Sequence, residues 1–296
     1  MTSQHTQMRN KRSARRKPPF MLRMLRLGFK SLGPILPGLA ARYAYHIWFM
    51  TRRHTTPARE QVWLQQADTR FIDTPVGSIA TYHWGHDGPL VYLVHGWNGR
   101  GSQLAAFAAP LVERGYRVVS FDGPGHGLTP GANRTNLLRF SDALQSLVTQ
   151  IGPAEAIIAH SFGVAAMAYS LNNLNLKTNR VIAISTPSQM YHLAEYFFQS
   201  LRIPKRVQQH FVKMVEQEFG PDLWQRISPH TNVPALGHIP ALLLHDKDDH
   251  DVPVAEGQYL HSLWPNSQYV QTEGLGHRRI LRNQKVREQI IEFLTA

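Results

Sequence analysis

The chain has 296 residues and no cysteine, which is long enough for one large α/β domain or for a core domain with an insertion. The lack of cysteine excludes a disulfide framework, thiolate chemistry and cysteine-based zinc sites. The formal net charge of +12 lies in residues 1–53, which hold twelve Lys or Arg and no Asp or Glu, whereas residues 54–296 hold 20 of each sign. A nucleic-acid-binding domain spreads its basic residues over a folded face, so we do not expect a nucleic-acid partner.

The N-terminal segment, residues 1–60, combines a basic run with two helical patterns. Residues 9–17 hold six Lys or Arg, a composition typical of a solvated segment. Residues 20–32 place basic side chains on one side of a predicted helix and apolar ones mostly on the other, and Gly33-Pro34 ends the pattern. Residues 36–50 predict a second helix, which is too short and too polar to span a membrane.

Two interpretations of the first helix remain open. A basic amphipathic helix beside a polybasic run is typical of peripheral contact with an anionic membrane surface. Alternatively, the helix packs on the protein's own core. Because Arg23, Arg26 and Lys30 interrupt the apolar stretch, a signal peptide is not favoured. We therefore expect a cytoplasmic protein, in contact with the inner face of a membrane if the first interpretation holds.

From residue 70 onward, apolar runs of strand length alternate with helical patterns. Residues 71–74 and 78–84 flank a Pro-Val-Gly turn and predict an edge hairpin. The continuous apolar run Leu90–Val94 is typical of a strand covered on both faces. Further strands are expected at 116–121, 156–159, 180–185, 241–245 and 268–272, and helices at 103–114, 136–150 and 283–294. This alternation predicts an α/β fold with a mostly parallel sheet.

Residues 156–166 predict a buried strand that turns sharply into a helix of small residues. The corner, Ala159-His160-Ser161-Phe162-Gly163, matches the G-x-S-x-G nucleophile elbow except that alanine replaces the first glycine. A serine there faces the unpaired N–H groups and the positive dipole end of the helix. A lone serine at a strand end is also a common helix N-cap, so a nucleophile needs partners elsewhere.

Two later strand ends carry candidate partners for Ser161. Residues 245–253 contain four Asp and two His, but no second cluster supplies further ligands at a known spacing, so we expect no metal. His277 follows a glycine-containing turn at the end of another predicted strand. The glycine-containing loops lack G-K-[ST] and G-x-G-x-x-G, so we expect no nucleotide cofactor.

From about residue 70 to its C-terminus, the chain resembles the serine α/β-hydrolases, in particular esterases and lipases with a helical cap. The order Ser161, Asp, His277 is the triad order of that family. Four places carry the resemblance: an oxyanion loop at His95-Gly96-Trp97, the elbow at 159–163, an acid loop at 245–253 and a histidine loop at Gly276-His277. The resemblance implies an α/β-hydrolase core at 61–186 and 238–296, with a helical cap at 187–237.

The resemblance also implies the catalytic residues. Alignment on Val252-Pro253 selects Asp249 as the acid and leaves Asp246, Asp248 and Asp251 as solvated loop residues, with Asp248 as a possible substitute for Asp249. His277 would take the proton of Ser161, and Asp249 would orient and stabilise its imidazole.

Backbone N–H groups of Trp97 and Phe162 would bind the oxyanion. We expect structural roles for His95, Asp122 and His126, because only one base is needed.

We therefore expect a cofactor-free serine hydrolase that cleaves a carboxylic ester through an acyl-enzyme. Many aromatic residues in the expected cap favour a substrate with an apolar acyl or alcohol group, although most such side chains pack a cap onto its core. A thioesterase or a lysophospholipase-like lipid hydrolase is an alternative within enzymes. The departures at Ala159 and Asp246 leave a third hypothesis, a catalytically silent α/β-hydrolase fold used for binding.

Overall fold

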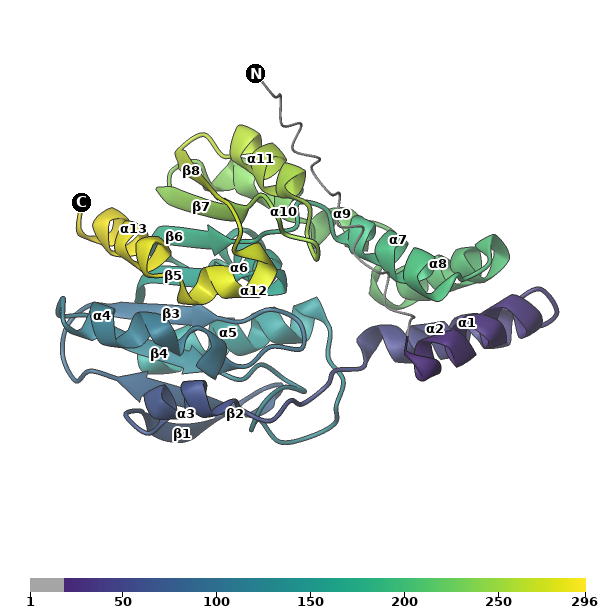
Figure 1. The fold of residues 1–296 in the computed structure, drawn as a ribbon, viewed down its shortest axis with the longest axis horizontal. Helices are drawn as coiled ribbons and strands as arrows, with labels where there is room; N and C mark the ends of the chain where they lie inside the picture. The colour runs from purple at the N-terminus through teal and green to yellow at the C-terminus, as the bar shows by residue number, and fades with distance from the viewer. Residues whose placement is uncertain (1–18) are drawn as a thin grey trace, which may run out of the picture.

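In the computed structural model, which describes residues 19–296, eight strands form one sheet in the order β1-β2-β4-β3-β5-β6-β7-β8 (Figure 1). The strands are β1 (Asp68–Thr74), β2 (Gly77–Trp84), β3 (Leu90–Val94), β4 (Arg117–Phe121), β5 (Ala154–His160), β6 (Thr178–Ile184), β7 (Ala241–Asp246) and β8 (Ser267–Thr272). Strand β2 runs antiparallel to β1 and β4, and the remaining neighbours pair in parallel. The predicted edge hairpin and mostly parallel sheet are confirmed.

Helices cover both faces of the sheet (Figure 1). One face packs against α3 (Ala58–Leu64), α4 (Ala108–Val112) and α13 (Gln284–Thr295), and the other against α5 (Leu137–Ile151), α6 (Phe162–Asn173) and α11 (Val254–Leu263). Successive strand side chains alternate between the two cores: Leu93 belongs to the first, and Tyr92 and Val94 to the second. The continuous apolar run of β3 is therefore buried on both sides, as expected for a central parallel strand.

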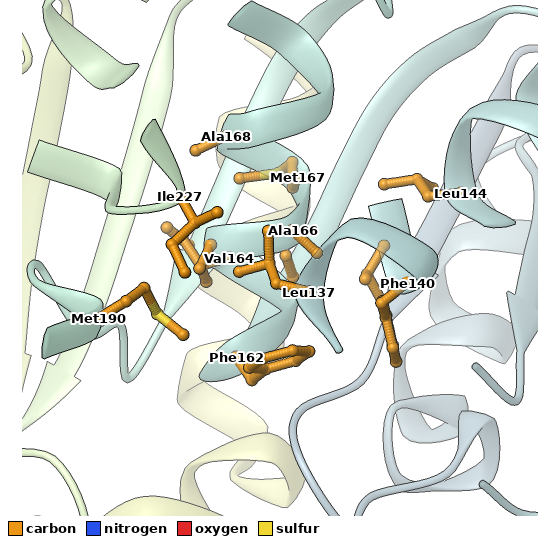
Figure 2. Packing of buried hydrophobic residues seen from close by; sticks show 14 of the residues in the cluster. Leu137, Phe140, Leu144, Phe162, Val164, Ala166, Met167, Ala168, Met190 and Ile227 are labelled. Carbon is orange, nitrogen blue, oxygen red and sulfur yellow. The ribbon is translucent and has the colours of Figure 1, made fainter. Parts of the chain in front are cut away.

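Helix α6 lies at the centre of the second core (Figure 2). Val164 and Met167 are fully buried, and the surrounding side chains include Phe140 of α5. Met190 and Ile227, which come from the segment between β6 and β7, complete the same cluster. This packing joins the inserted segment to the helix that follows Ser161.

The prediction of a continuous helix over residues 103–114 is wrong for the first half of that range. Two 3-10 turns, η1 (Gly101–Gln103) and η2 (Ala105–Phe107), precede α4. Pro110 has no N–H to donate to the carbonyl of Ala106, and in a continuous helix its ring would clash with that carbonyl. The α-helix therefore begins at Ala108, where Pro110 falls in its first turn.

The segment between β6 and β7, in which the sequence predicts a helical cap, is helical, and we refer to it as the cap. Its elements are α7 (Met190–Leu201), α8 (Lys205–Phe219), α9 (Leu223–Arg226), α10 (Pro229–Asn232) and η3 (Val233–Leu236). The four-residue helices α9 and α10 return the chain to the core. Figure 1 shows α7 and α8 projecting beyond one end of the sheet.

The two N-terminal helices, α1 (Phe20–Leu32) and α2 (Pro37–Phe49), pack against this cap (Figure 1). The ring of Trp48 in α2 lies 5.2 Å from that of Phe197 and 6.0 Å from that of Phe211. In α1, Arg26 Nε donates a hydrogen bond to the carbonyl of Ser200 at 2.8 Å. Neither helix, nor any other helix of residues 19–296, has the length and apolar character needed to cross a membrane.

Candidate active site

Ser161 lies at the turn between β5 and α6, with φ 54° and ψ −122°. A positive φ is strained for a non-glycine residue and persists only where the surrounding structure enforces it. The Ser161 N–H donates to the carbonyl of Ile184 in β6 at 2.9 Å, and its carbonyl accepts from Val164 N–H at 2.9 Å. Ser161 occupies the N-cap position of α6, but its hydroxyl makes no cap hydrogen bond. The hydroxyl is therefore available for another role.

Glycines allow the neighbouring segments to approach this turn closely. A Cβ on Gly163 would lie 2.6 Å from the carbonyl oxygens of both Val94 and His95, and one on Gly96 would lie 3.0 Å from Ser161 Cβ. Ala159, which replaces the first glycine of the pattern, is fully buried and aligns with Val94 on one side and Ala183 on the other. Its methyl group is therefore accommodated within the regular strand pairing.

His277 pairs with a buried carboxylate. It lies in the short helix α12 (Gly276–Arg279), and its Nδ1 donates to Asp249 Oδ2 at 2.7 Å. Asp249 Oδ1 accepts from the N–H groups of Asp251 at 2.9 Å and Val252 at 2.8 Å. Burial tends to raise the pKa of Asp249, but hydrogen bonds from His245, His277 and Val252 outweigh it and hold this pKa well below its usual range. The ionised carboxylate fixes the tautomer of His277 and leaves Nε2 to accept a proton.

Two other acids of the loop point elsewhere. Asp248 is exposed, and its carboxylate accepts from the N–H of Gly274 at 2.9 Å. Asp251 pairs with the exposed Arg278 at 2.9 Å. Asp249 is therefore the acid that contacts His277.

The prediction that Asp246 is a solvated loop residue is wrong. Its side chain is fully buried at the end of β7. One oxygen accepts from the N–H groups of Gly276 at 2.8 Å and Asp248 at 3.0 Å, and the other from the hydroxyl of Thr272 at 2.7 Å and the N–H of Leu275 at 3.0 Å. These bonds outweigh burial and lower the pKa of Asp246. The only sign of this role in the sequence is that aspartate stands where the acid loop usually has glycine.

His160, which the sequence analysis gave no role, links the elbow to the histidine loop. Its Nε2 lies 2.9 Å from the carbonyl oxygen of His277, and the two rings lie 4.6 Å apart. A carbonyl can only accept, so Nε2 carries the proton. Burial lowers the pKa of His160 well below its ordinary value, which keeps the ring neutral. Its position directly before Ser161 is the one signal that could have identified it.

The loop that follows β3 lies against the elbow. The ring of Trp97 packs edge-to-face on that of Phe162 at 5.0 Å. The Phe162 N–H belongs to the first turn of α6, where backbone donors have no partner within the helix. Among the bonds of residues 19–296, neither the Phe162 nor the Trp97 N–H donates to a loop carbonyl or a side chain. Within the described residues, these two backbone N–H groups therefore have no such partner.

Two neutral histidines hold this loop in place. His95 Nε2 accepts from Gly123 N–H at 2.9 Å, and its Nδ1 donates to Gly96 O at 2.7 Å. His126 Nε2 accepts from Asn98 N–H at 3.1 Å. Burial lowers the pKa of His95 to about 4 and that of His126 to about 3. Both act as structural hydrogen-bonding groups, as expected.

A third anchor of the same loop is the buried carboxylate of Asp122. It accepts from Gly101 N–H at 2.7 Å, from the Tyr82 hydroxyl at 2.6 Å and from Leu128 N–H at 2.7 Å. The expected structural role of Asp122 is therefore confirmed.

The structure brings Ser161, His277 and Asp249 to one edge of the sheet, at the ends of β5, β8 and β7. Among residues 19–296, no hydrogen bond joins Ser161 Oγ to His277. The polar contacts of His277 are those with Asp249 and His160. Catalytic hydrogen bonds are often long until substrate binds. Within the same described range, no group of three His, Asp or Glu is arranged to hold a metal ion.

Comparison with known proteins agrees with this architecture. The sequence model of the Alpha/beta hydrolase family matches residues 91–289, and the chain belongs to that family. It is 32% identical over 109 residues to the AB hydrolase superfamily protein YfhM of Bacillus subtilis, covering 34% of this chain and 37% of that protein. It is also 32% identical over 87 residues to the non-heme chloroperoxidase CPO-A1 of Kitasatospora aureofaciens, covering 29% and 31%. The chain thus matches only about a third of the length of these relatives.

Three solved structures show the same fold. A lipase described as putative, from Acinetobacter baumannii, has a TM-score of 0.60 and 19% identity, covering 80% of this chain and 93% of that one. A membrane phospholipase A has a TM-score of 0.62 and 17% identity, covering 93% and 96%. An esterase from Exiguobacterium antarcticum has a TM-score of 0.59 and 17% identity, covering 77% and 100%. At these identities, the likeness concerns the fold alone.

Proposed function

We propose that the protein is a serine hydrolase that cleaves carboxylic esters with Ser161 as nucleophile, His277 as base and Asp249 as orienting acid. The observation that carries this proposal is the 2.7 Å hydrogen bond from His277 Nδ1 to the buried Asp249, near the strained turn of Ser161. A serine hydroxyl is a weak nucleophile at neutral pH and needs such a base.

The proposed reaction has two steps. Ser161 Oγ attacks the ester carbonyl carbon while His277 Nε2 takes its proton, and the collapse of the tetrahedral intermediate releases the alcohol, which receives that proton. Water then attacks the acyl-enzyme by the same route and releases the carboxylic acid. The N–H groups of Trp97 and Phe162 are the proposed oxyanion donors, each worth about 3 kcal/mol in the transition state.

The proposed substrate has an apolar acyl or alcohol group. The cap supports this choice because its Met190 and Ile227 pack beside α6 at the elbow (Figure 2). A lipid ester is a second candidate, favoured by the likeness to a membrane phospholipase A over 93% of this chain and by the apolar surface described in the next subsection. Thioesters are a further substrate class for the same chemistry.

The test is hydrolysis of p-nitrophenyl esters from acetate to palmitate, together with acyl thioesters and a lysophospholipid. We expect turnover by the wild type, its loss in Ser161→Ala and its retention in Ser262→Ala, which removes an exposed hydroxyl of α11. The chain length that is cleaved fastest would report the depth of the acyl site. Equal turnover by wild type and Ser161→Ala would overturn the proposal, and no turnover of any substrate would favour a fold used for binding.

A further inference from the structure

The outer sides of α1 and α2 carry a concentration of exposed apolar side chains. Among residues 19–296, nine of the sixteen exposed large apolar side chains fall between residues 20 and 43, with exposed fractions of 49% to 75%. We call this set the N-terminal apolar surface: Phe20, Met21, Met24, Leu27, Leu32, Ile35, Leu36, Leu39 and Tyr43. Exposed apolar side chains gathered in this way usually mark an interaction site.

This surface is additional to the apolar side that holds the helices on the protein. In α1, Phe29 is 3% exposed, and Leu22 and Leu25 pack against the core. In α2, Ala41 and Ala44 are fully buried. Helix α1 therefore has one apolar side that packs and another that faces outward. The packing interpretation accounts only for the inner side, and membrane contact through the outer side stays a prediction.

The charge around the surface selects the chemistry of its partner. Arg23 and Lys30 in α1 and Arg42 in α2 are exposed beside the apolar side chains. Residues 1–53 contain no Asp or Glu, and residues 9–17 add six Lys or Arg directly ahead of α1. A partner for this segment must therefore offer both apolar area and negative charge.

We propose that the N-terminal apolar surface docks the protein on an anionic phospholipid bilayer. Its apolar side chains enter the boundary between headgroups and acyl chains, and its basic side chains lie at the level of the lipid phosphates. Because α1 and α2 pack on α7 and α8, the cap is held next to the bilayer. The proposal rests on this surface alone, and not on the proposed ester hydrolysis.

Two other occupants fit the surface less well. Residues 1–18 contain few apolar side chains, namely Met1, Met8, Ala14 and Pro18, which cannot match nine large apolar ones. A second copy of the chain would bring together two segments that each carry twelve Lys or Arg and no acid, and such like charges repel.

The test is flotation of the full-length protein with phosphatidylcholine vesicles, with and without phosphatidylglycerol. One variant, Phe20→Ser/Met24→Ser/Leu27→Ser, removes three exposed side chains of the surface. A matched control, Val62→Ser/Phe71→Ser/Tyr259→Ser, removes three side chains of similar exposure elsewhere. A third variant, Arg23→Gln/Lys30→Gln/Arg42→Gln, keeps the apolar side chains and removes exposed charge.

We expect the wild type and the control to bind anionic vesicles at least about tenfold more strongly than neutral ones, with binding that weakens as salt rises. The apolar variant should lose most of its binding to both kinds of vesicle. The charge variant should show a smaller preference for anionic lipid than the wild type, because residues 9–17 keep their six Lys or Arg, while its melting temperature stays unchanged. Equal flotation of the wild type and both surface variants would overturn the proposal. A dimer in sedimentation velocity that the apolar variant abolishes, without any flotation of the wild type, would assign the surface to a second copy instead.

Discussion

Asp246 Oδ1 accepts a hydrogen bond from the N–H of Gly276 at 2.8 Å, one residue before His277 in the chain. The same buried carboxylate accepts from Leu275 N–H and from the hydroxyl of Thr272. The last residue of β7 thus holds the loop that carries His277, and Asp249 then orients the imidazole. Two carboxylates of one loop have separate tasks: Asp246 fixes the backbone of the histidine loop, and Asp249 fixes its side chain.

The variant Asp246→Asn should lower both stability and turnover. Its amide NH2 group would face N–H donors, which leaves buried donors unpaired at a cost of about 1–3 kcal/mol. Because the change displaces His277 rather than the substrate site, we expect kcat to fall about tenfold or more with a nearly constant KM. Ester kinetics and urea unfolding measure the two effects.

The variant Thr272→Val is the graded comparison for Asp246, because it removes one hydrogen bond of that carboxylate and leaves its backbone donors paired. It should lose less activity than Asp246→Asn. Wild-type kcat in Asp246→Asn would contradict the positioning role.

The variant Asp249→Asn should lower kcat by about 10³- to 10⁴-fold, because an amide cannot hold His277 in the required tautomer. Asp248→Asn should retain nearly wild-type turnover, since the Asp248 carboxylate is exposed and, among residues 19–296, bonds only to the Gly274 N–H. Circular dichroism would show that both variants are folded. If the two variants lost activity equally, the choice of Asp249 over Asp248 would be wrong.

The buried histidines predict a dependence of stability on pH. Burial lowers the pKa of His95 to about 4 and that of His126 to about 3, whereas histidine in an unfolded chain titrates near about 6.5. Between these values the unfolded state binds more protons, so the contribution of the two histidines to the free energy of unfolding is complete above about pH 7 and falls as the pH drops from about 6.5 to about 4. Each group contributes a slope of up to about 1.4 kcal/mol per pH unit.

The variant His126→Asn should flatten this dependence, because it removes one group that must stay neutral in the folded state. His86→Asn, which replaces an exposed histidine, should leave the wild-type slope unchanged. Urea unfolding at several pH values measures both. A slope that His126→Asn does not alter would exclude His126 as its source.

The variant Gly163→Ala should destabilise the protein, although glycine-to-alanine changes inside helices usually gain about 1 kcal/mol. The added Cβ would lie 2.6 Å from two backbone carbonyl oxygens, so α6 must move away from β3 at a cost of about 1–3 kcal/mol or more. Gly28→Ala in α1 is the matched control, because its Cβ would meet nothing within 4 Å. Thermal unfolding should rank Gly163→Ala below the wild type and Gly28→Ala at or above it.

Much of the fold could be predicted because local patterns agree with the tertiary structure. The apolar run Leu90–Val94 became a fully buried strand, and the helical pattern of residues 20–32 became α1 with the same bounds. The alignment on Val252-Pro253 selected Asp249, and this is the acid that contacts His277 in the structure. Each of these three features is specified by a short stretch of consecutive residues, so its pattern can be recognised in the sequence.

The remainder depends on contacts between distant segments. The buried carboxylate of Asp246 is stabilised by hydrogen bonds from N–H groups some thirty residues away in the chain. The residues of its own loop give no sign of these donors. Likewise, the helical period of α1 shows that the helix is amphipathic, but not that Leu22 and Leu25 pack inward while Met24 and Leu27 face outward. That division depends on where the cap helices lie.

The most direct test of the central claim is labelling with a fluorophosphonate probe, followed by mass spectrometry of the modified peptide. The account predicts one adduct on Ser161 in the wild type, no adduct in Ser161→Ala and strongly slowed labelling in His277→Gln, which keeps the serine but removes its base. Absence of an adduct from the folded wild type, or an adduct on any other residue, would contradict the assignment of Ser161 as the nucleophile.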